Sequence, residues 1–209
     1  MTILLTASLI ALLPLIHFAS ASPEPPSAAP APAPGTTARA SDYIRTSCET
    51  TLYPELCYRS LFGYANAVQK DPARLARVAV GVSLSRARHM ADYLANISGA
   101  AEYGGDGRAS AAVHDCFSVF GDAVEQIRGS LKKMRRLNGT GEELRFQMSD
   151  VQTWMSAALT NEDTCTDGFE DVEDGPLKTD VCDRTVKVKE VTSNALALVN
   201  SYAAKVVAP

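Results

Sequence analysis

The feature that most constrains the fold is a long apolar seam between Ser110 and Leu137. Its members recur at alternating steps of four and three residues, which is the spacing of one face of an α-helix. A strand would instead place apolar residues at every second position. The seam consists of Val113, Phe117, Phe120, Val124, Ile127, Leu131 and Met134. Such a helix has to bury its seam against other helices, so this segment predicts an all-α bundle.

The same spacing recurs in three further segments, which predicts four long helices. One runs over 72–98, with Asp71 as its N-cap and proline at its first position. Another runs over 142–171, where only Glu162 interrupts the apolar seam. The last begins near Lys178.

The expected connections between these helices are short, at 99–106, 138–141 and 173–176. Gly175-Pro176 is expected to end the third helix, because proline cannot continue the hydrogen-bond ladder. Short connections favour antiparallel neighbours. The prediction for 72–207 is therefore an antiparallel up-down-up-down four-helix bundle.

Residues 41–69 precede the bundle and contain Cys48 and Cys57 on either side of Tyr53-Pro54. Pro54 interrupts any helix there, so two short helical pieces should fold back on each other. A disulfide between the two cysteines would clip this N-terminal helical hairpin.

The first forty residues predict secretion. Residues 1–21 combine an uncharged apolar run with the small residues Ala19-Ser20-Ala21, which is typical of a signal peptide. Residues 22–40, rich in Pro, Ala and Ser, are expected to form an extended linker. This arm is either a simple tether or, in a plant secretory pathway, a hydroxyproline glycosylation module. A single domain is then expected over 41–207.

Five cysteines in a secreted chain predict two bridges and one spare thiol, although the sequence does not fix their pairing. A short bridge 48–57 and a bridge 116–165 between the second and third bundle helices are geometrically plausible, and Cys182 is then left over. Asn-x-Ser/Thr motifs at Asn96 and Asn138 are candidate glycosylation sites.

The sequence contains no recognisable set of catalytic residues. His89 and His114 lie on separate predicted helices, and paired acids such as Glu142-Glu143 are typical of solvated helix faces. We therefore expect no catalytic residue, no metal site and no cofactor. The net charge is −4 and the basic residues are scattered along the sequence, so neither nucleic acid nor a membrane is an expected partner.

One stripe on the third predicted helix, away from its seam, is unusual. Small and hydroxylated residues follow each other there, although threonine is a mediocre helix former. The stripe contains Thr153, Ala157, Thr160, Thr164 and Gly168, and Asn161 and Asp163 flank it. Such a face either docks against another protein or packs tightly against a neighbouring helix.

Three stretches carry a family resemblance. They are Cys48 to Cys57 followed by Ser60-Leu61, Trp154 to Cys165 continuing to Phe169, and Thr192 to Asn200. Together they resemble the plant invertase inhibitor and pectin methylesterase inhibitor family. The resemblance covers about 41–207, with four cysteines in the family order.

The resemblance implies a four-helix bundle capped by a helical hairpin, with bridges Cys48–Cys57 and Cys116–Cys165. It also implies a function without chemistry, in which the bundle binds a pectin methylesterase one-to-one and covers its pectin-binding cleft in the plant cell wall (apoplast). The matching positions implied as partner contacts are Thr160, Asn161, Asp163 and Thr164, and the stripe adds Thr153. Glu125, Gly129 and Lys132 on the second bundle helix are weaker candidates.

Within the family, residues 144–151 lack the Pro-Lys-Phe triplet of invertase inhibitors, which favours the esterase-directed branch. No catalytic domain follows Pro209, so a free-standing inhibitor is expected, monomeric alone and a heterodimer with its target. The alternatives are an inhibitor of cell-wall or vacuolar acid invertase and, in a different class, a structural wall module without an enzyme target.

Overall fold

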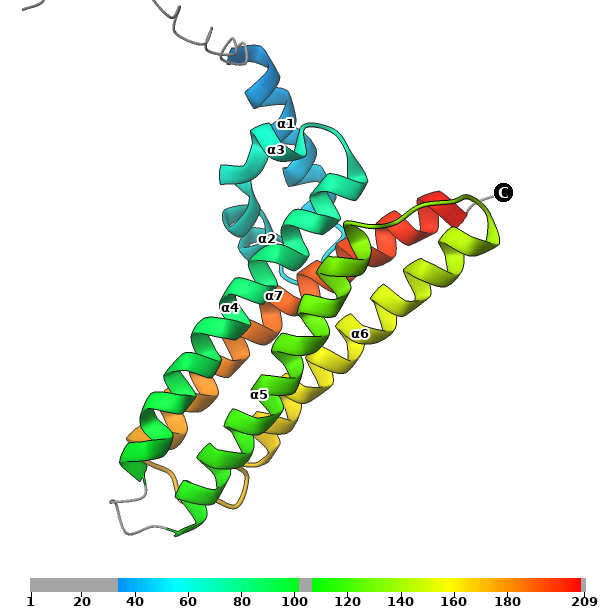
Figure 1. The fold of residues 1–209 in the computed structure, drawn as a ribbon. Coiled ribbons are helices and arrows are strands. Elements are labelled where there is room, and N and C mark those ends of the chain that lie inside the picture. Colours follow the sequence, from blue (N-terminus) through cyan, green and yellow to red (C-terminus); the bar gives the residue numbers. More distant parts are fainter. Residues whose placement is uncertain (1–33, 102–106, 208–209) are drawn as a thin grey trace, which may run out of the picture. The chain divides into compact units, whose positions relative to one another are not determined.

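The computed structural model describes residues 34–101 and 107–207, which form helices joined by turns. Its four long helices are α4 (Pro72–Ala101), α5 (Gly107–Met134), α6 (Glu142–Asp167) and α7 (Pro176–Val207). Successive long helices run in opposite directions (Figure 1), and each packs against two others, so that α4, α5, α6 and α7 close a ring. The predicted antiparallel four-helix bundle is confirmed.

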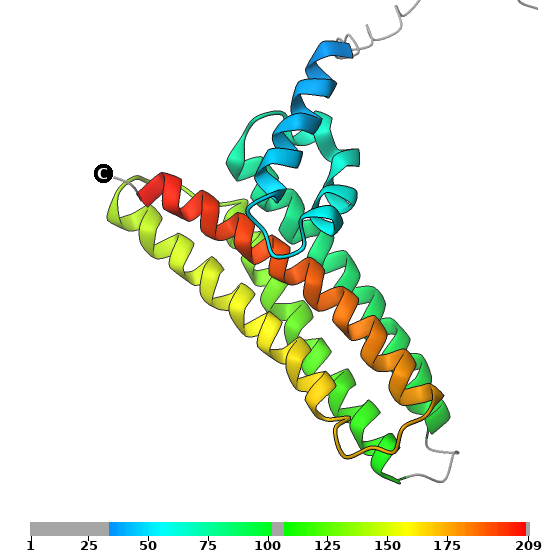
Figure 2. The ribbon, with the colours of Figure 1, turned by 180° about the vertical axis from the view of Figure 1, so that it is seen from behind.

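The N-terminal hairpin consists of α1 (Pro34–Cys48), α2 (Pro54–Leu61), the 3-10 turn η1 (Phe62–Tyr64) and α3 (Ala65–Val68). It packs on α4 and α7, which lie next to each other in the view from behind (Figure 2). A disulfide joins Cys48, the last residue of α1, to Cys57 of α2, with their Cα atoms 5.6 Å apart. Asp71 caps α4 as expected, because its Oδ1 accepts the backbone N–H of Ala73 at 2.8 Å.

The apolar seams of the four long helices meet in one core, with one exception. Phe117, expected inside, is 39% exposed, whereas its neighbour Cys116 is 1% exposed. Cys116 forms a disulfide with Cys165 of α6 across a Cα–Cα distance of 4.4 Å. The bridge fixes the rotation of α5 about its axis, and residue 117, turned by about 100° from residue 116, then faces outward.

The third bundle helix is shorter than predicted. α6 ends at Asp167 and not at Asp171. Phe169 and Val172 are still buried, but they lie in tight turns: the N–H of Phe169 donates to the carbonyl of Thr166, and that of Val172 to the carbonyl of Phe169. The buried apolar seam therefore continues beyond the last residue of the helix. Pro176 opens α7, a position where its missing N–H costs nothing.

The last part of the predicted linker is helical and not extended. Residues 34–40 belong to α1, and Ala40 is buried with Ile44 and Cys48 at helical steps of four. A periodic apolar face thus begins inside the Ala-rich arm, where composition alone predicted an extended chain. The expected signal peptide 1–21 and the linker residues 22–33 lie outside the described residues. Of the described helices, none is long and apolar enough to cross a membrane.

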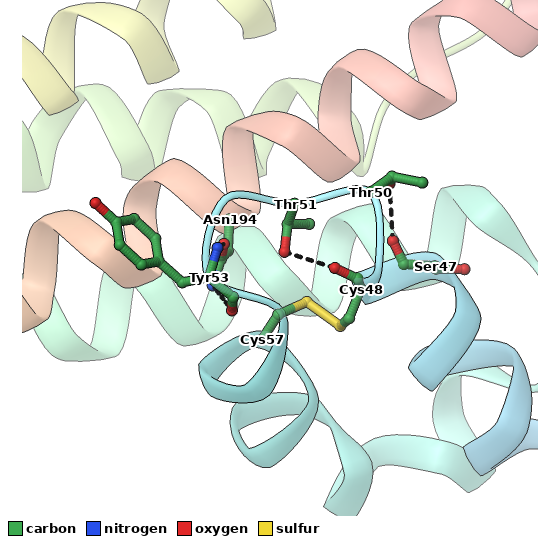
Figure 3. Close-up of a disulfide and its surroundings, with 7 residues drawn as sticks. All are labelled: Ser47, Cys48, Thr50, Thr51, Tyr53, Cys57 and Asn194. Carbon is green, nitrogen blue, oxygen red and sulfur yellow. Dashed lines mark hydrogen bonds between the residues drawn. A yellow bond between two sulfur atoms is a disulfide. The ribbon is translucent and has the colours of Figure 1, made fainter.

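A buried amide clamps the hairpin to the bundle (Figure 3). Asn194 of α7 is buried; its Oδ1 accepts the N–H of Tyr53 at 3.1 Å, and its Nδ2 donates to the carbonyl of Tyr53 at 2.9 Å. The Asn194 side chain thereby bonds the backbone of the loop between Cys48 and Cys57, in the way that another backbone segment would. This pair of hydrogen bonds accounts for the asparagine at position 194 in the stretch Thr192 to Asn200.

Replacing Asn194 with alanine should destabilise the fold by about 1–3 kcal/mol, because it leaves the partly buried N–H of Tyr53 without its partner. The carbonyl of Tyr53 loses one hydrogen bond and keeps the one from the N–H of Cys57. Urea denaturation measures the loss. Asn200→Ala on the same helix is the control: Asn200 is exposed and accepts one hydrogen bond from Gln152, so its loss should be below about 1 kcal/mol. Equal losses for the two variants would contradict the role given to Asn194.

Candidate functional site

The outward face of α6 is the candidate site. α6 packs against α5 on one edge and α7 on the other, and the strip between those edges is open. The exposed residues from 146 to 167 are Phe146, Ser149, Thr153, Ser156, Thr160, Thr164 and Asp167. We call Ser149, Thr153, Ser156, Thr160 and Thr164 the hydroxyl row. Since the row is exposed, the alternative that this stripe packs against a neighbouring helix does not hold for its threonines.

The hydroxyl row can be covered at small cost. Thr160 Oγ1 donates to the carbonyl of Ser156 at 3.2 Å, and Thr164 Oγ1 donates to the carbonyl of Thr160 at 2.9 Å. Because these two hydroxyl protons are already hydrogen-bonded within the helix, a partner surface that covers them does not leave them without an acceptor. Of the exposed residues from 146 to 167, only Asp167 is charged. The exposed Arg145 lies one turn before Ser149 and is the basic residue of α6 at the other end of the row.

The predicted contacts Asn161 and Asp163 flank the row but are engaged elsewhere. Asn161 Nδ2 donates to Gln126 Oε1 of α5 at 3.1 Å. Asp163 forms an ion pair with Lys189 of α7. The structure therefore places Thr153, Thr160 and Thr164 on the open strip, whereas Asn161 and Asp163 hold α6 to its two neighbours and line the edges of the strip.

Trp154 forms the edge of the strip on the α5 side. It is half-buried against Gly129, where an added Cβ would meet the indole Cε3 at 3.3 Å, so a larger residue at 129 would push the ring back by a few tenths of an ångström. Lys133 Nζ lies 5.6 Å from the ring centroid and 2.8 Å from the carboxylate of Asp150. Of the weaker candidates, Gly129 thus contributes to this edge.

The other two weaker candidates do not lie on the strip. Glu125 pairs with Arg128 on the exposed face of α5. Lys132 lines a groove between α5 and α4, on the side of α5 away from the hydroxyl row. The structure therefore does not bring either residue together with the predicted threonines.

A buried carboxyl group lies on the inner side of α6. Glu162, the residue that interrupts the seam, is fully buried; its Oε1 accepts a hydrogen bond from Thr192 Oγ1 of α7 at 2.9 Å. Because that hydroxyl proton is used, Ser83 Oγ of α4 is the donor in its 2.9 Å bond to Thr192. Glu162 Oε2 has no hydrogen-bond partner among the described residues. Burial raises the pKa of Glu162 to about 8.

The other titratable groups considered from the sequence lie apart. His89 and His114 are exposed on α4 and α5, and the carboxylate nearest His114 is that of its neighbour Asp115, at 3.9 Å. Cys182 of α7 is a free, half-buried thiol whose pKa is raised by burial. Within the described ranges, no three His, Cys, Asp or Glu side chains converge in a way that could hold a metal ion.

Both candidate glycosylation sites are accessible. Asn96 is exposed on α4, and Asn138 is exposed in the connection between α5 and α6. Gln147 Nε2 donates to the side-chain oxygen of Asn138 at 3.0 Å, which holds that loop against α6. Glycosylation at either asparagine stays a prediction.

Besides Asp167 at its end, three exposed residues of the strip were missed by the sequence analysis. Ser149 and Ser156 could have been found, since they extend the steps of four and three that join Thr153 to Thr160. Phe146 could not, because an aromatic residue near a helix start is usually buried, yet it is 70% exposed here. It adds an apolar side chain at one end of the hydroxyl row.

Sequence comparison assigns most of the chain to a known family. A family model described as plant invertase/pectin methylesterase inhibitor matches residues 42–198. The "21 kDa protein" of Daucus carota is 41% identical over 176 residues, covering 83% of this chain and 90% of that protein. "Pectinesterase inhibitor 3" of Arabidopsis thaliana is 42% identical over 164 residues, covering 77% of this chain and 79% of that protein.

Solved structures agree in fold. The crystal structure of mutant form A of a pectin methylesterase inhibitor from Arabidopsis superposes with a TM-score of 0.60 at 21% identity. The match covers 75% of this chain and 95% of that chain. At this identity the likeness concerns the helical architecture alone.

Proposed function

Because this chain belongs to the plant invertase/pectin methylesterase inhibitor family, we propose that it inhibits a pectin methylesterase by covering the substrate cleft of that enzyme. The family model is described as one of inhibitors, and the relatives named pectinesterase inhibitor 3 and pectinesterase inhibitor 10 are named for inhibition and not for an enzymatic activity. The observation that carries the proposal is the hydroxyl row, a strip of small exposed side chains along α6.

The proposed mechanism is occlusion without chemistry. Small side chains let a partner backbone approach α6 closely, and the hydroxyl oxygens still accept hydrogen bonds from that partner. Phe146 adds an apolar anchor at one end of the strip, and such aromatic anchors contribute strongly to interface affinity. Each chain presents one such strip, so one inhibitor binds one enzyme molecule.

The proposed site of action is the plant cell wall. The signal-peptide pattern over 1–21 supports secretion, and so do the two disulfides, because disulfides persist in oxidising compartments. The exposed positions of Asn96 and Asn138 are compatible with glycosylation along the same route.

The esterase is preferred over acid invertase as the target. Residues 144–151 lack the Pro-Lys-Phe triplet, and relatives at about two-fifths identity are named pectinesterase inhibitors. A direct assay of both enzymes distinguishes the two targets.

The test titrates the purified, oxidised protein against a plant pectin methylesterase and, in parallel, an acid invertase, from acid to neutral pH. Loss of esterase activity at one inhibitor per enzyme, with invertase unaffected, is the expected result. Loss of invertase activity alone would reject the esterase as the target and indicate an invertase inhibitor. No effect on either enzyme would reject inhibition and favour a structural wall module.

A further inference from the structure

A basic groove lies between α4 and α5, away from the hydroxyl row. Its volume is about 760 Å³, and its walls carry five cationic side chains but a single carboxylate, Asp92. The cations are Arg88 of α4, Arg128 and Lys132 of α5, and Arg135 and Arg136 in the turn that directly follows α5. We call this the α4–α5 groove. The fold thus brings together basic residues that are scattered along the sequence, because α4, which carries residue 88, packs against α5, which carries or precedes residues 128–136.

Most of these charges are not neutralised within the protein. Arg128 pairs with Glu125. Among the ion pairs of the described residues, none involves Arg88, Lys132, Arg135 or Arg136, and all four side chains are exposed. In a chain of net charge −4, an unpaired cluster of this kind reverses the local potential and favours an anionic partner.

The arrangement fits a linear anion better than a compact one. Arg128 and Lys132 lie one turn apart on α5, and the N–H of Arg135 still donates to the carbonyl of Leu131, so the cations from 128 to 135 span about 10 Å of groove. A compact phosphate site would instead have converging backbone N–H groups, as at a helix N-terminus, and the groove is bounded by the middle and end of two helices.

The groove suits a carboxylated saccharide better than a nucleic acid. Single-stranded nucleic acids bind by stacking their bases on aromatic side chains. The described lining contains no Phe, Tyr or Trp, and Tyr64 lies only in the adjoining hollow, past Gly81. Guanidinium groups in a row pair well with successive carboxylates of a polymer, two N–H donors to each.

We infer that the α4–α5 groove binds an acidic polysaccharide, namely a run of de-esterified galacturonate residues. The choice of polymer rests on the proposed function, since the carboxylates are what a pectin methylesterase exposes. The anion-binding character of the groove rests on its own charges. Bound in this way, the inhibitor would be retained on wall polymer near the enzyme's product while the hydroxyl row on α6 stays free.

The test measures binding of a purified oligogalacturonate to the protein by isothermal titration calorimetry at low ionic strength, with no esterase present. Binding is expected, weakening as salt is added, and a fully methyl-esterified oligomer should not bind. The double variant Arg88→Gln/Arg135→Gln, one residue from each wall, should bind roughly fivefold to tenfold more weakly. The control Lys70→Gln/Lys205→Gln removes two exposed charges elsewhere and should bind as the wild type does.

Three results would overturn the inference. They are no binding by the wild type, equal weakening by the two double variants, or equally tight binding of a single-stranded oligonucleotide of the same charge. Thr160→Arg separates this inference from the proposed function, because it should leave oligogalacturonate binding unchanged whatever it does to esterase inhibition. Circular dichroism checks that each variant is folded.

Discussion

Thr160→Arg should weaken inhibition of pectin methylesterase by about a hundredfold or more. Thr160 lies within the hydroxyl row, where close approach of the enzyme depends on small side chains. An arginine there introduces a long charged group that has to be desolvated or has to hold the two surfaces apart, and such changes cost several kcal/mol at an interface. The inhibition constant, measured by titrating esterase activity, reports the loss.

The variant should remain folded. Thr160 is exposed, its hydroxyl bonds only within its own helix, and arginine has a higher helix propensity than threonine. Ala95→Arg adds the same side chain to an exposed position of α4, which is not one of the helices packed on α6, and should inhibit as the wild type does. Equal inhibition by Thr160→Arg and the wild type would remove the hydroxyl row from the interface.

The second large effect concerns stability and pH. Burial raises the pKa of Glu162 to about 8 from its ordinary 4.5, with Asp163 adding to the rise and Thr192 and Lys189 opposing it. The neutral carboxyl group is therefore favoured in the folded state. Its contribution is fully present below about pH 4.5 and is lost as the pH rises through about 8.

Glu162→Gln should remove this dependence. The free energy of unfolding of the wild type, relative to the variant, should fall between pH 5 and pH 8 by on the order of 4 kcal/mol, since each pKa unit corresponds to about 1.4 kcal/mol. Urea denaturation at several pH values measures the difference. Glu170→Gln, at an exposed position after α6, should show no such slope relative to the wild type.

If the free energy of unfolding differed between the wild type and Glu162→Gln by the same amount at every pH, this result would contradict a neutral buried carboxyl group. It would indicate that Glu162 is ionised in the folded state throughout this range. The hydrogen-bond chain from Ser83 through Thr192 would then end on a charge.

The bundle could be predicted because its helices bury continuous seams. The seam of α5 alone requires other helices to cover it, and the short connections then leave little choice of topology. The interrupted position, Glu162, was visible as an anomaly, but its burial was not predictable, because the hydroxyl groups that accommodate it come from Ser83 and Thr192 on other helices.

Helix ends and side-chain rotation were harder to predict. Phe117 fits the seam by spacing, yet the Cys116–Cys165 bridge turns it outward. Phe169 and Val172 continue the seam of α6 in a tight turn, since burial does not require helical backbone bonds. In both cases a contact between distant segments overrides a local pattern.

The candidate site was predictable only in part. The threonines of the hydroxyl row follow from their spacing, because a solvent-facing row of poor helix formers is unusual. That Asn161 bonds Gln126 and Asp163 pairs with Lys189 depends on which helices adjoin α6, which no local pattern contains. The α4–α5 groove was missed for the same reason, since its cations come together only when the two helices pack.

The central claim is that the outward face of α6 covers the enzyme, and hydroxyl-radical footprinting of the equimolar complex tests it most directly. Phe146, 70% exposed beside the hydroxyl row, is the reporter, and Phe62 and Tyr64, exposed at 54% and 47% in the hairpin, are internal controls. Oxidation of Phe146 should fall on adding the esterase, while that of Phe62 and Tyr64 stays unchanged. Protection of the hairpin aromatics with Phe146 unaffected would contradict the account and place the inhibitory surface on the hairpin.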